Sequence, residues 1–214
     1  MIIALKQKIF LTLSLLLLLA AGLPAQAFQH PGIPLTVADL DNVKSNLTVA
    51  PWSAGYSALA GDWHSSTNYT MQGPFGYVNR NYYGTYDNEN QWKNDMQAIF
   101  NLAVMWKLTG DANYAQKSRD ILIAWATTMT NFNGIEAGMD LGDYATRYAG
   151  GADILRGTWP GWTTADTLTV SNFFNNVYGG AGAVNGDVLG PANKGSLALV
   201  MPVAPRLMRP PVML

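Results

Sequence analysis

Two runs of apolar residues with helical spacing, over residues 94–109 and 112–129, adjoin each other near the middle of the chain. Their apolar positions are Met96, Ile99, Phe100, Ala103 and Trp106, followed by Tyr114, Ile121, Leu122 and Trp125. Between the runs, Gly110 suits the left-handed position at a helix end, and Asp111 can cap the next helix. So short a connection joins antiparallel neighbours. The pattern predicts an αα-hairpin whose contact includes Trp106 and Trp125.

Two shorter helices are predicted before this hairpin. Thr36, followed three residues later by Asp39, is a variant of the capping box that marks the start of a helix. The apolar face of this helix consists of Leu40, Val43 and Leu47. A second short helix is expected over residues 52–59, directly after Pro51.

A longer helix is predicted after the hairpin, beyond a break that is rich in turn-forming residues. It runs from Asp140 or Leu141 to Arg156. In its middle, Gly150 and Gly151 weaken the helix but permit a neighbouring helix to approach closely.

A last helix is predicted over residues 165–178, capped by Thr163 or Thr164. Its expected buried positions are Leu168, Phe173 and Val177. No stretch shows sustained strand alternation, so the predicted fold class is all-α, built from successive antiparallel helix pairs. A tetratricopeptide-like solenoid is a minor alternative, because no second copy of the hairpin occurs about 34 residues away.

The first residues have the pattern of a secretory signal peptide. Lys6 and Lys8 give a positive start, residues 9–23 are apolar but short for a membrane span, and residues 25–27 read Ala-Gln-Ala, which fits a cleavage site. An uncleaved membrane anchor is the alternative. We expect a secreted or periplasmic protein whose mature chain begins at residue 28.

Composition narrows the possible partners. A formal net charge of -1 with 13% charged residues provides no basic stripe for nucleic acid. The chain has no Cys, and its two His, His30 and His64, lack metal-ligand spacing, so no metal or other cofactor is expected. We expect a monomer with no nucleic-acid partner and, after removal of the signal peptide, no membrane contact.

Aromatic and amide side chains gather in the segment before the hairpin. Residues 77–90 show neither helical nor strand periodicity, so they are predicted to form a long loop. Aromatic rings stack on sugars, and Arg pairs with carboxylates. The residues expected to line one wall of an acidic-glycan cleft are Arg80, Tyr82, Tyr83 and Trp92. A merely solvated loop is the alternative.

A series of landmarks runs in order along the mature chain. It consists of His30-Pro31-Gly32, Thr36-x-x-Asp39-Leu40, Pro51-Trp52-x-x-Gly55-Tyr56, Ala103-x-x-Trp106-Lys107-x-Thr109-Gly110-Asp111-x-x-Tyr114-Ala115 and Leu122-x-x-Trp125-Ala126. Over about residues 30–200, this series resembles the alginate lyase family of polysaccharide lyases. The resemblance implies an incomplete α/α toroid with a substrate cleft across its mouth. It also implies β-elimination on a uronate-containing polysaccharide such as alginate, in the periplasm or outside the cell.

Elimination at a uronate needs a group that neutralises the carboxylate, a base for the C5 proton and an acid for the departing oxygen. The resemblance implies that Asn193 neutralises the carboxylate, and it places Lys194 where the family has its catalytic His. Lys194 can also bind a substrate carboxylate. The alternative for Asn193 is a helix cap, and the alternative for Lys194 is an ordinary solvated side chain.

Tyr144 or Tyr148 is the candidate proton carrier in place of that His, with Tyr144 preferred. The two tyrosines lie four residues apart and share a helix face, and Arg147 on the same helix is a candidate second carboxylate partner. The alternative is that both rings belong to the core, which we expect for at least one of them.

The last residues depart from the family pattern. Residues 201–214 contain four prolines where an apolar helix would continue, and proline at this density does not propagate a helix. We hypothesise a frameshift or early stop near codon 200. The expected organisation is a signal peptide (1–27), the N-terminal part of a toroid domain (28–200) and a disordered or out-of-frame tail (201–214). Two function classes stay open, namely a truncated polysaccharide lyase with little or no activity and a non-catalytic glycan-binding helical domain.

Overall fold

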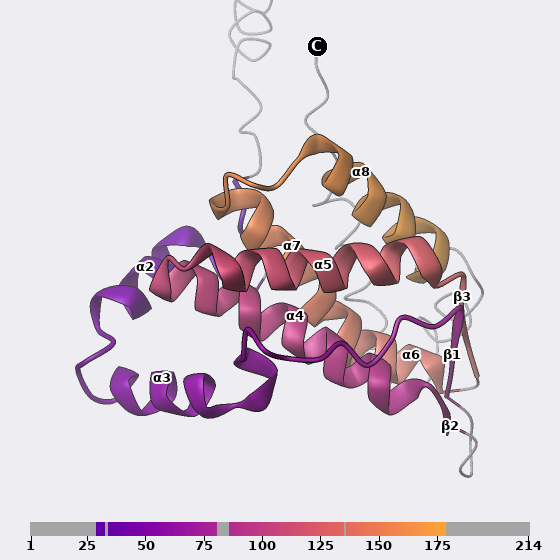
Figure 1. The fold of residues 1–214 in the computed structure, drawn as a ribbon, viewed down its shortest axis with the longest axis horizontal. Helices are drawn as coiled ribbons and strands as arrows, with labels where there is room; N and C mark the ends of the chain where they lie inside the picture. The colour runs from indigo at the N-terminus through magenta and orange to yellow at the C-terminus, as the bar shows by residue number, and fades with distance from the viewer. Residues whose placement is uncertain (1–28, 33, 81–85, 135, 179–214) are drawn as a thin grey trace, which may run out of the picture.

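The computed structural model describes residues 29–32, 34–80, 86–134 and 136–178, which form mainly helices (Figure 1). The helices are α2 (Val37–Ser45), α3 (Trp52–Gly61), α4 (Glu89–Thr109), α5 (Ala112–Thr128), α6 (Ala137–Asp140), α7 (Thr146–Thr158) and α8 (Thr164–Phe173). One 3-10 turn, η1 (Trp63–Ser65), and two π-helical segments, η2 (Leu141–Ala145) and η3 (Phe174–Tyr178), accompany them. The predicted all-α fold class is confirmed. No described helix combines the length and apolar character that crossing a bilayer requires.

The predicted hairpin is present as α4 and α5, which run antiparallel through the middle of the fold (Figure 1). Gly110 ends α4 with a φ of 79°, in the left-handed region where a side chain would be strained. Asp111 caps α5, because its side chain accepts a hydrogen bond from the backbone N–H of Asn113 at 3.0 Å. The helix α4 begins at Glu89 rather than at Asn94, so the prediction missed its first turn.

The two hairpin tryptophans face different neighbours. Trp125 lies between α4 and α5 and donates its indole N–H to Asp95 at 2.8 Å. Trp106 instead donates its indole N–H to Thr158 of α7 at 3.0 Å. Trp125 therefore stabilises the hairpin itself, whereas the Trp106 N–H ties the hairpin to the next helix.

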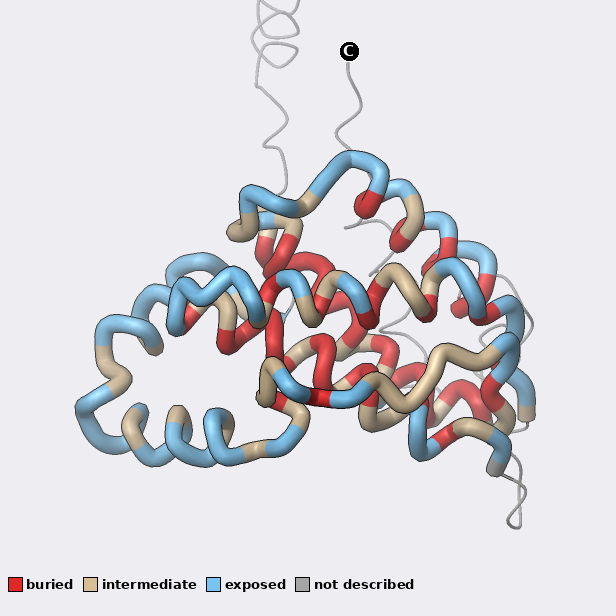
Figure 2. The backbone as a smooth tube through the Cα atoms, in the orientation of Figure 1, coloured by how far each residue is buried: buried red, intermediate tan, exposed pale blue. Residues whose placement is uncertain are grey.

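The close approach of α7 to α4 is confirmed at a glycine. A Cβ at Gly151 would lie 2.5 Å from Cγ2 of Ile99, too close for any side chain without a shift of the neighbouring helix. The helix that carries this glycine starts earlier than predicted, because α6, η2 and α7 continue one another from Ala137 to Thr158. Figure 2 shows that burial concentrates on α4 and α7, whereas α3 has no buried residue.

Part of the predicted long loop is a small sheet. The strand β1 (Tyr77–Arg80) pairs antiparallel with β2 (Tyr86–Asp87) and parallel with β3 (Asn131–Asn133). The prediction of a loop over residues 77–90 is therefore wrong at both of its ends. The reason is that β3 comes from far along the chain, so the partner that stabilises β1 leaves no local periodicity.

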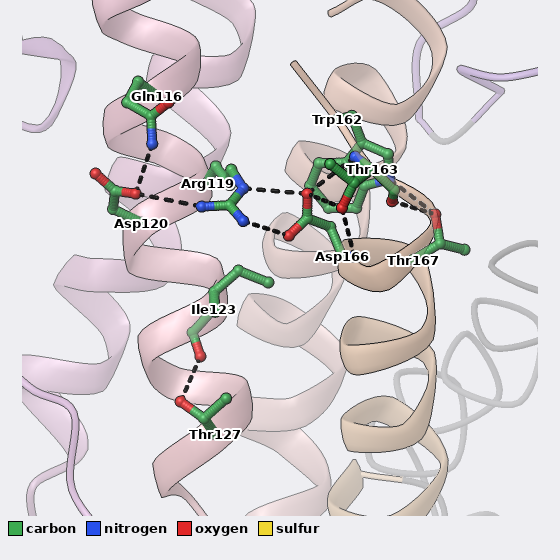
Figure 3. A network of polar contacts seen from close by, with 9 residues as sticks. All are labelled: Gln116, Arg119, Asp120, Ile123, Thr127, Trp162, Thr163, Asp166 and Thr167. Atoms are coloured by element: carbon green, nitrogen blue, oxygen red, sulfur yellow. Dashed lines mark hydrogen bonds and ion pairs between the residues drawn. The ribbon is translucent and has the colours of Figure 1, made fainter. Parts of the chain in front are cut away.

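The helix cap predicted at Thr163 or Thr164 is confirmed at Thr163, which forms a capping box with Asp166 at the start of α8. Asp166 also accepts two hydrogen bonds from Arg119 of α5, at 2.7 and 3.1 Å, which fasten α8 to α5 (Figure 3). Burial alone would raise the pKa of Asp166, but Arg119 and the cap bonds hold it below its usual value.

The predicted buried face of α8 needs one correction. Phe173 and Val177 are buried as expected, but the Leu168 side chain is exposed. Leu168 lies two residues from the buried Val170, about 200° around the helix, and therefore faces away from α5.

Candidate functional site

Five charged side chains meet where β1, the start of α4 and α6 adjoin, at one end of the molecule in Figure 1. We call them the charge cluster, and they are Arg80 from β1, Glu89 and Lys93 from α4, Glu136 just before α6, and Asp140 at the end of α6. Three carboxyl groups thus share two cations in a small volume.

Glu89 lies at the centre of the charge cluster. Its Oε1 accepts one hydrogen bond from Arg80 Nη1, at 2.8 Å, and another from Lys93 Nζ. Lys93 Nζ also lies 3.0 Å from Asp140 Oδ1. Arg80 reaches two further carboxylates, with Nη2 at 3.4 Å from Glu136 Oε2 and Nε at 3.8 Å from Asp140 Oδ1. Each cation therefore bridges at least two carboxyl groups.

Burial separates the proton affinities of the two inner carboxyl groups. The side chains of Glu89 and Asp140 are 3% and 5% exposed. Burial, together with the neighbouring Glu89, raises the pKa of Asp140 to about 6, against the opposing effect of Lys93. Burial also acts to raise the pKa of Glu89, but the hydrogen bond from Lys93 and the charge of Arg80 lower it. Two carboxyl groups of different pKa side by side are a common arrangement for proton transfer.

Local geometry explains how these groups come together. Glu89 and Lys93 are four residues apart on the first turns of α4 and so share a face. Gly134, just after β3, has a φ of 107°, and a Cβ there would overlap the backbone of Arg80. Only glycine admits this close approach, which brings Glu136 next to Arg80.

Tyr144 links the charge cluster to a further cation. The guanidinium carbon of Arg147 lies 4.3 Å from the centre of the Tyr144 ring, and Lys93 Nζ lies 5.2 Å from it. Arg147 is held by its own hydrogen bond to the Asp143 carbonyl oxygen, at 2.8 Å. Tyr144 belongs to the π-helical segment η2, and such segments are rare and occur frequently at functional sites.

A groove of about 510 Å³ adjoins Arg147, between α4 and the η2–α7 helix. Its lining includes Gln97 and Phe100 from α4, together with Thr146 and Arg147. An aromatic ring, an amide, a hydroxyl and a guanidinium are the kinds of group that bind the ring, the hydroxyls and the carboxylate of an acidic sugar.

The structure brings together three of the residues predicted from the sequence. Arg80 pairs with Glu89, which also binds Lys93. The Tyr144 ring lies near Lys93 Nζ, and Arg147 stacks on the same ring. Four other predicted residues lie outside the described residues and are Tyr82, Tyr83, Asn193 and Lys194.

The structure contradicts the prediction that Trp92 lines a cleft wall. Its side chain is 0% exposed, and its indole N–H is donated to the Tyr178 hydroxyl at 2.9 Å. The ring also packs edge-on against Phe132. Trp92 is therefore a core residue beneath the site and does not line a cleft wall.

The core alternative is confirmed for Tyr148. This side chain is fully buried and donates its hydroxyl to the Leu122 carbonyl oxygen at 3.1 Å. Burial raises its pKa well above the ordinary value for tyrosine. Of the two candidate tyrosines, only Tyr144 is partly exposed.

Four members of the charge cluster were missed by the sequence analysis, namely Glu89, Lys93, Glu136 and Asp140. One signal was available, because Glu89 and Lys93 form an i, i+4 pair, as is typical of a helix start with opposite charges. The predicted loop over residues 77–90 includes Glu89, so the pair is not predicted as the start of a helix.

A family model described as alginate lyase matches residues 46–184. The chain belongs to the alginate lyase family. The matched residues include the whole charge cluster, Tyr144 and Arg147, whereas Asn193 and Lys194 lie beyond them. No match was found among the curated proteins or among the solved structures compared. Membership of the alginate lyase family suggests polysaccharide lyase activity and an acidic polysaccharide as substrate.

Proposed function

We propose that this chain contains a secreted polysaccharide lyase domain that cleaves a uronate-containing, alginate-like polysaccharide by β-elimination. Family membership supports the reaction class. The observation that carries the placement of the site is the Tyr144 ring between Lys93 and Arg147, beside the groove between α4 and α7. The helical hairpins described above would form part of an α/α toroid around this groove.

The proposed roles follow from the chemistry of the groups. Arg147 pairs with a substrate carboxylate, and Asn193 neutralises the carboxylate of the reacting uronate, which makes its C5 proton more acidic. A base removes that proton, the C4–O4 bond breaks, a C4–C5 double bond forms, and an acid protonates O4. Tyr144 is the proton carrier that we assign to this step.

The unsaturated product absorbs in the near ultraviolet, so the assay is direct. We expect the full chain to form little or none of this product from alginate, and any that forms to be lost in Asn193→Ala and in Tyr144→Phe. Tyr114→Phe, on the remote end of α5, is the matched control and should keep the wild-type rate. Product formation that survives both site substitutions would show that the site is placed wrongly.

A second candidate function is glycan binding without catalysis. Lys194 favours it, because this residue stands where the family resemblance places the catalytic His. This candidate predicts that alginate oligosaccharides bind and that no unsaturated product forms, even after prolonged incubation. Binding measured by titration together with product detection by mass spectrometry separates the two functions.

Secretion is part of the proposal and rests on the signal-peptide pattern of residues 1–27. We expect the mature protein to begin with Phe28. N-terminal sequencing of protein recovered outside the cytoplasm tests this, and an intact Met1 on that protein would contradict it.

A further inference from the structure

A second hollow lies on the other side of α4 from the charge cluster. It has a volume of about 670 Å³ and is lined by side chains between Trp63 and Gln72 and by Gln91. Successive helix residues are about 100° apart, so Gln91 and Lys93 point to nearly opposite sides of α4, about 200° from each other. We call this feature the Trp63 hollow.

The rim of the hollow carries an exposed tryptophan in a fixed position. Trp63 is 53% exposed, although its ring centre lies 3.9 Å from that of His64 and 5.3 Å from that of Tyr69. An aromatic ring held by neighbouring rings loses little conformational entropy when a ligand stacks on its free side. Trp63 is thus suited to stacking on an apolar ligand face.

The floor of the hollow is fastened to one buried carboxylate. Asp95, which is fully buried, accepts hydrogen bonds from the Tyr69 hydroxyl at 2.7 Å and from the backbone N–H groups of Gln72 and Gly73, each at 2.9 Å. The segment from Tyr69 to Gly73 is therefore preformed before any ligand arrives.

A chain of polar side chains orients the amide at the edge of the hollow. His64 Nδ1 lies 2.7 Å from Asp62 Oδ1, and its Nε2 lies 3.3 Å from Asn94 Oδ1. Asn94 in turn donates its amide N–H to Gln72 Oε1 at 3.0 Å. Within the described part of the chain, the Gln72 side-chain NH₂ group makes no hydrogen bond and remains able to donate to a ligand.

The described residues that line the hollow carry no charge. This separates the hollow from the charge cluster, where cations and carboxylates predominate. A stacking ring with neutral amides and hydroxyls around it matches a pyranose ring, whose one face is apolar and whose edge carries hydroxyl groups. Nothing in the lining selects for a carboxylate.

We propose that the Trp63 hollow is a second glycan-binding site, which takes a pyranose unit of a polysaccharide by stacking on Trp63 and hydrogen bonding to Gln72 and Gln91. The site accepts neutral sugars and does not depend on ion pairing. Its lining shares no residue with the groove assigned to the lyase reaction, and its existence does not depend on that reaction.

The test uses the full chain and three soluble probes, namely neutral β-1,4-linked gluco- and manno-oligosaccharides and an alginate oligosaccharide. We expect a neutral probe to bind wild type, with an affinity that added salt leaves unchanged. Trp63→Ala should weaken this binding about tenfold or more, which corresponds to about 1.4 kcal/mol. Trp52→Ala is the matched control, because Trp52 on α3 is also exposed, at 39%, but lines no hollow described here.

A second variant and a second readout guard against a folding defect. Gln72→Ala leaves Trp63 in place and should weaken the same binding. In NMR spectra of the wild type, the indole N–H signal of Trp63 should shift on addition of a neutral probe. Failure of both neutral probes to bind wild type overturns the proposal. Binding that Trp63→Ala and Gln72→Ala leave unchanged also overturns it. So does binding restricted to alginate and abolished by salt, which would assign the ligand to the groove beside Arg147 instead.

Discussion

The charge cluster and the Trp63 hollow lie on two sides of the same helix, yet they are built on opposite principles. In the charge cluster, Glu89 and Lys93 of α4 meet ionised groups from β1 and α6. In the hollow, Asp95 of the same helix is surrounded by neutral donors, namely a phenol, an indole and two backbone N–H groups. One helix thus presents a charged surface to one side and a neutral aromatic surface to the other.

The difference has consequences for ligand choice and for pH. A cluster of shared charges responds to salt and to proton concentration, because each charge alters its neighbours. A carboxylate surrounded by neutral hydrogen-bond donors acts as a fixed structural anchor. We therefore expect the stability of the charge cluster to depend on pH, and recognition in the neighbouring groove, where Arg147 lies, to depend on the carboxylates of the ligand. Recognition at the Trp63 hollow should depend mainly on sugar shape.

The largest expected effect comes from removing the anchor of the hollow. Asp95→Ala leaves the buried Tyr69 hydroxyl and the Trp125 indole N–H without their acceptor. Each buried donor left unpaired costs about 1–3 kcal/mol, so we expect a loss of about 4 kcal/mol in the free energy of unfolding. Denaturant titration measures it.

Asp95→Asn is the conservative control, because it keeps one acceptor oxygen and the side-chain volume. It should lose less stability than Asp95→Ala. If Asp95→Ala unfolds at the same denaturant concentration as wild type, the anchor described for the hollow is wrong.

The second effect concerns the centre of the charge cluster. Glu89→Gln removes the charge that Arg80 and Lys93 share, and hydrogen bonds to charged groups contribute about 1.5–3 kcal/mol. We expect a loss of about 3 kcal/mol at neutral pH, measured by denaturant titration. Glu136→Gln is the matched control and should lose less, since Glu136 is more exposed and lies 3.4 Å from Arg80. Equal losses in the two variants would contradict the central place of Glu89.

These two regions also show what the sequence could predict. The caps at Thr36 and Thr163 and the corner at Gly110 were predicted correctly, because each depends on residues within four positions of one another. The hairpin followed from the same local signals.

What the sequence could not predict depends on distant partners. The strand β1 exists because β3 pairs with it, and Arg80 reaches Asp140 because that pairing brings the short helix α6 alongside β1. Trp92 is of a residue type that stacks on sugars, but it lies in the core against Tyr178. Because Tyr178 is far away in the sequence, no local pattern predicts this contact. The hollow likewise joins the segment after α3 to Gln91 of α4, with no periodic pattern to reveal it.

A third prediction tests the pH dependence of the charge cluster. The pKa of Asp140 is about 6 in the fold, compared with about 3.9 in an unfolded chain. Between these values the native state binds a proton that the unfolded state has released, so this group makes stability fall as the pH rises from about 4 to 6. Above pH 6 the charged form remains a cost to the native state.

Asp140→Asn removes this cost. We expect the variant to be more stable than wild type above pH 6, by up to about 2 kcal/mol, with the advantage vanishing below about pH 4. Thermal unfolding across this pH range measures the difference. A variant that is less stable than wild type at pH 8 would show that the pairing of Asp140 with Lys93 outweighs its burial.

The smallest expected effect distinguishes the two binding surfaces directly. Arg147 lies over the Tyr144 ring and lines the groove, where its guanidinium can pair with a uronate carboxylate. An exposed cation–π contact or ion pair contributes about 0.5–1 kcal/mol, so Arg147→Gln should weaken the binding of an alginate oligosaccharide about two- to fivefold. Its effect should shrink at high salt, because the lost interaction is between charges.

The same substitution should leave neutral oligosaccharide binding at Trp63 unchanged, whereas Trp63→Ala should leave the salt-sensitive part of alginate binding unchanged. Titration of both variants with both probes, at low and high salt, measures all four outcomes. If Arg147→Gln weakens both probes equally, the two sides of α4 act as one surface and the distinction between them fails.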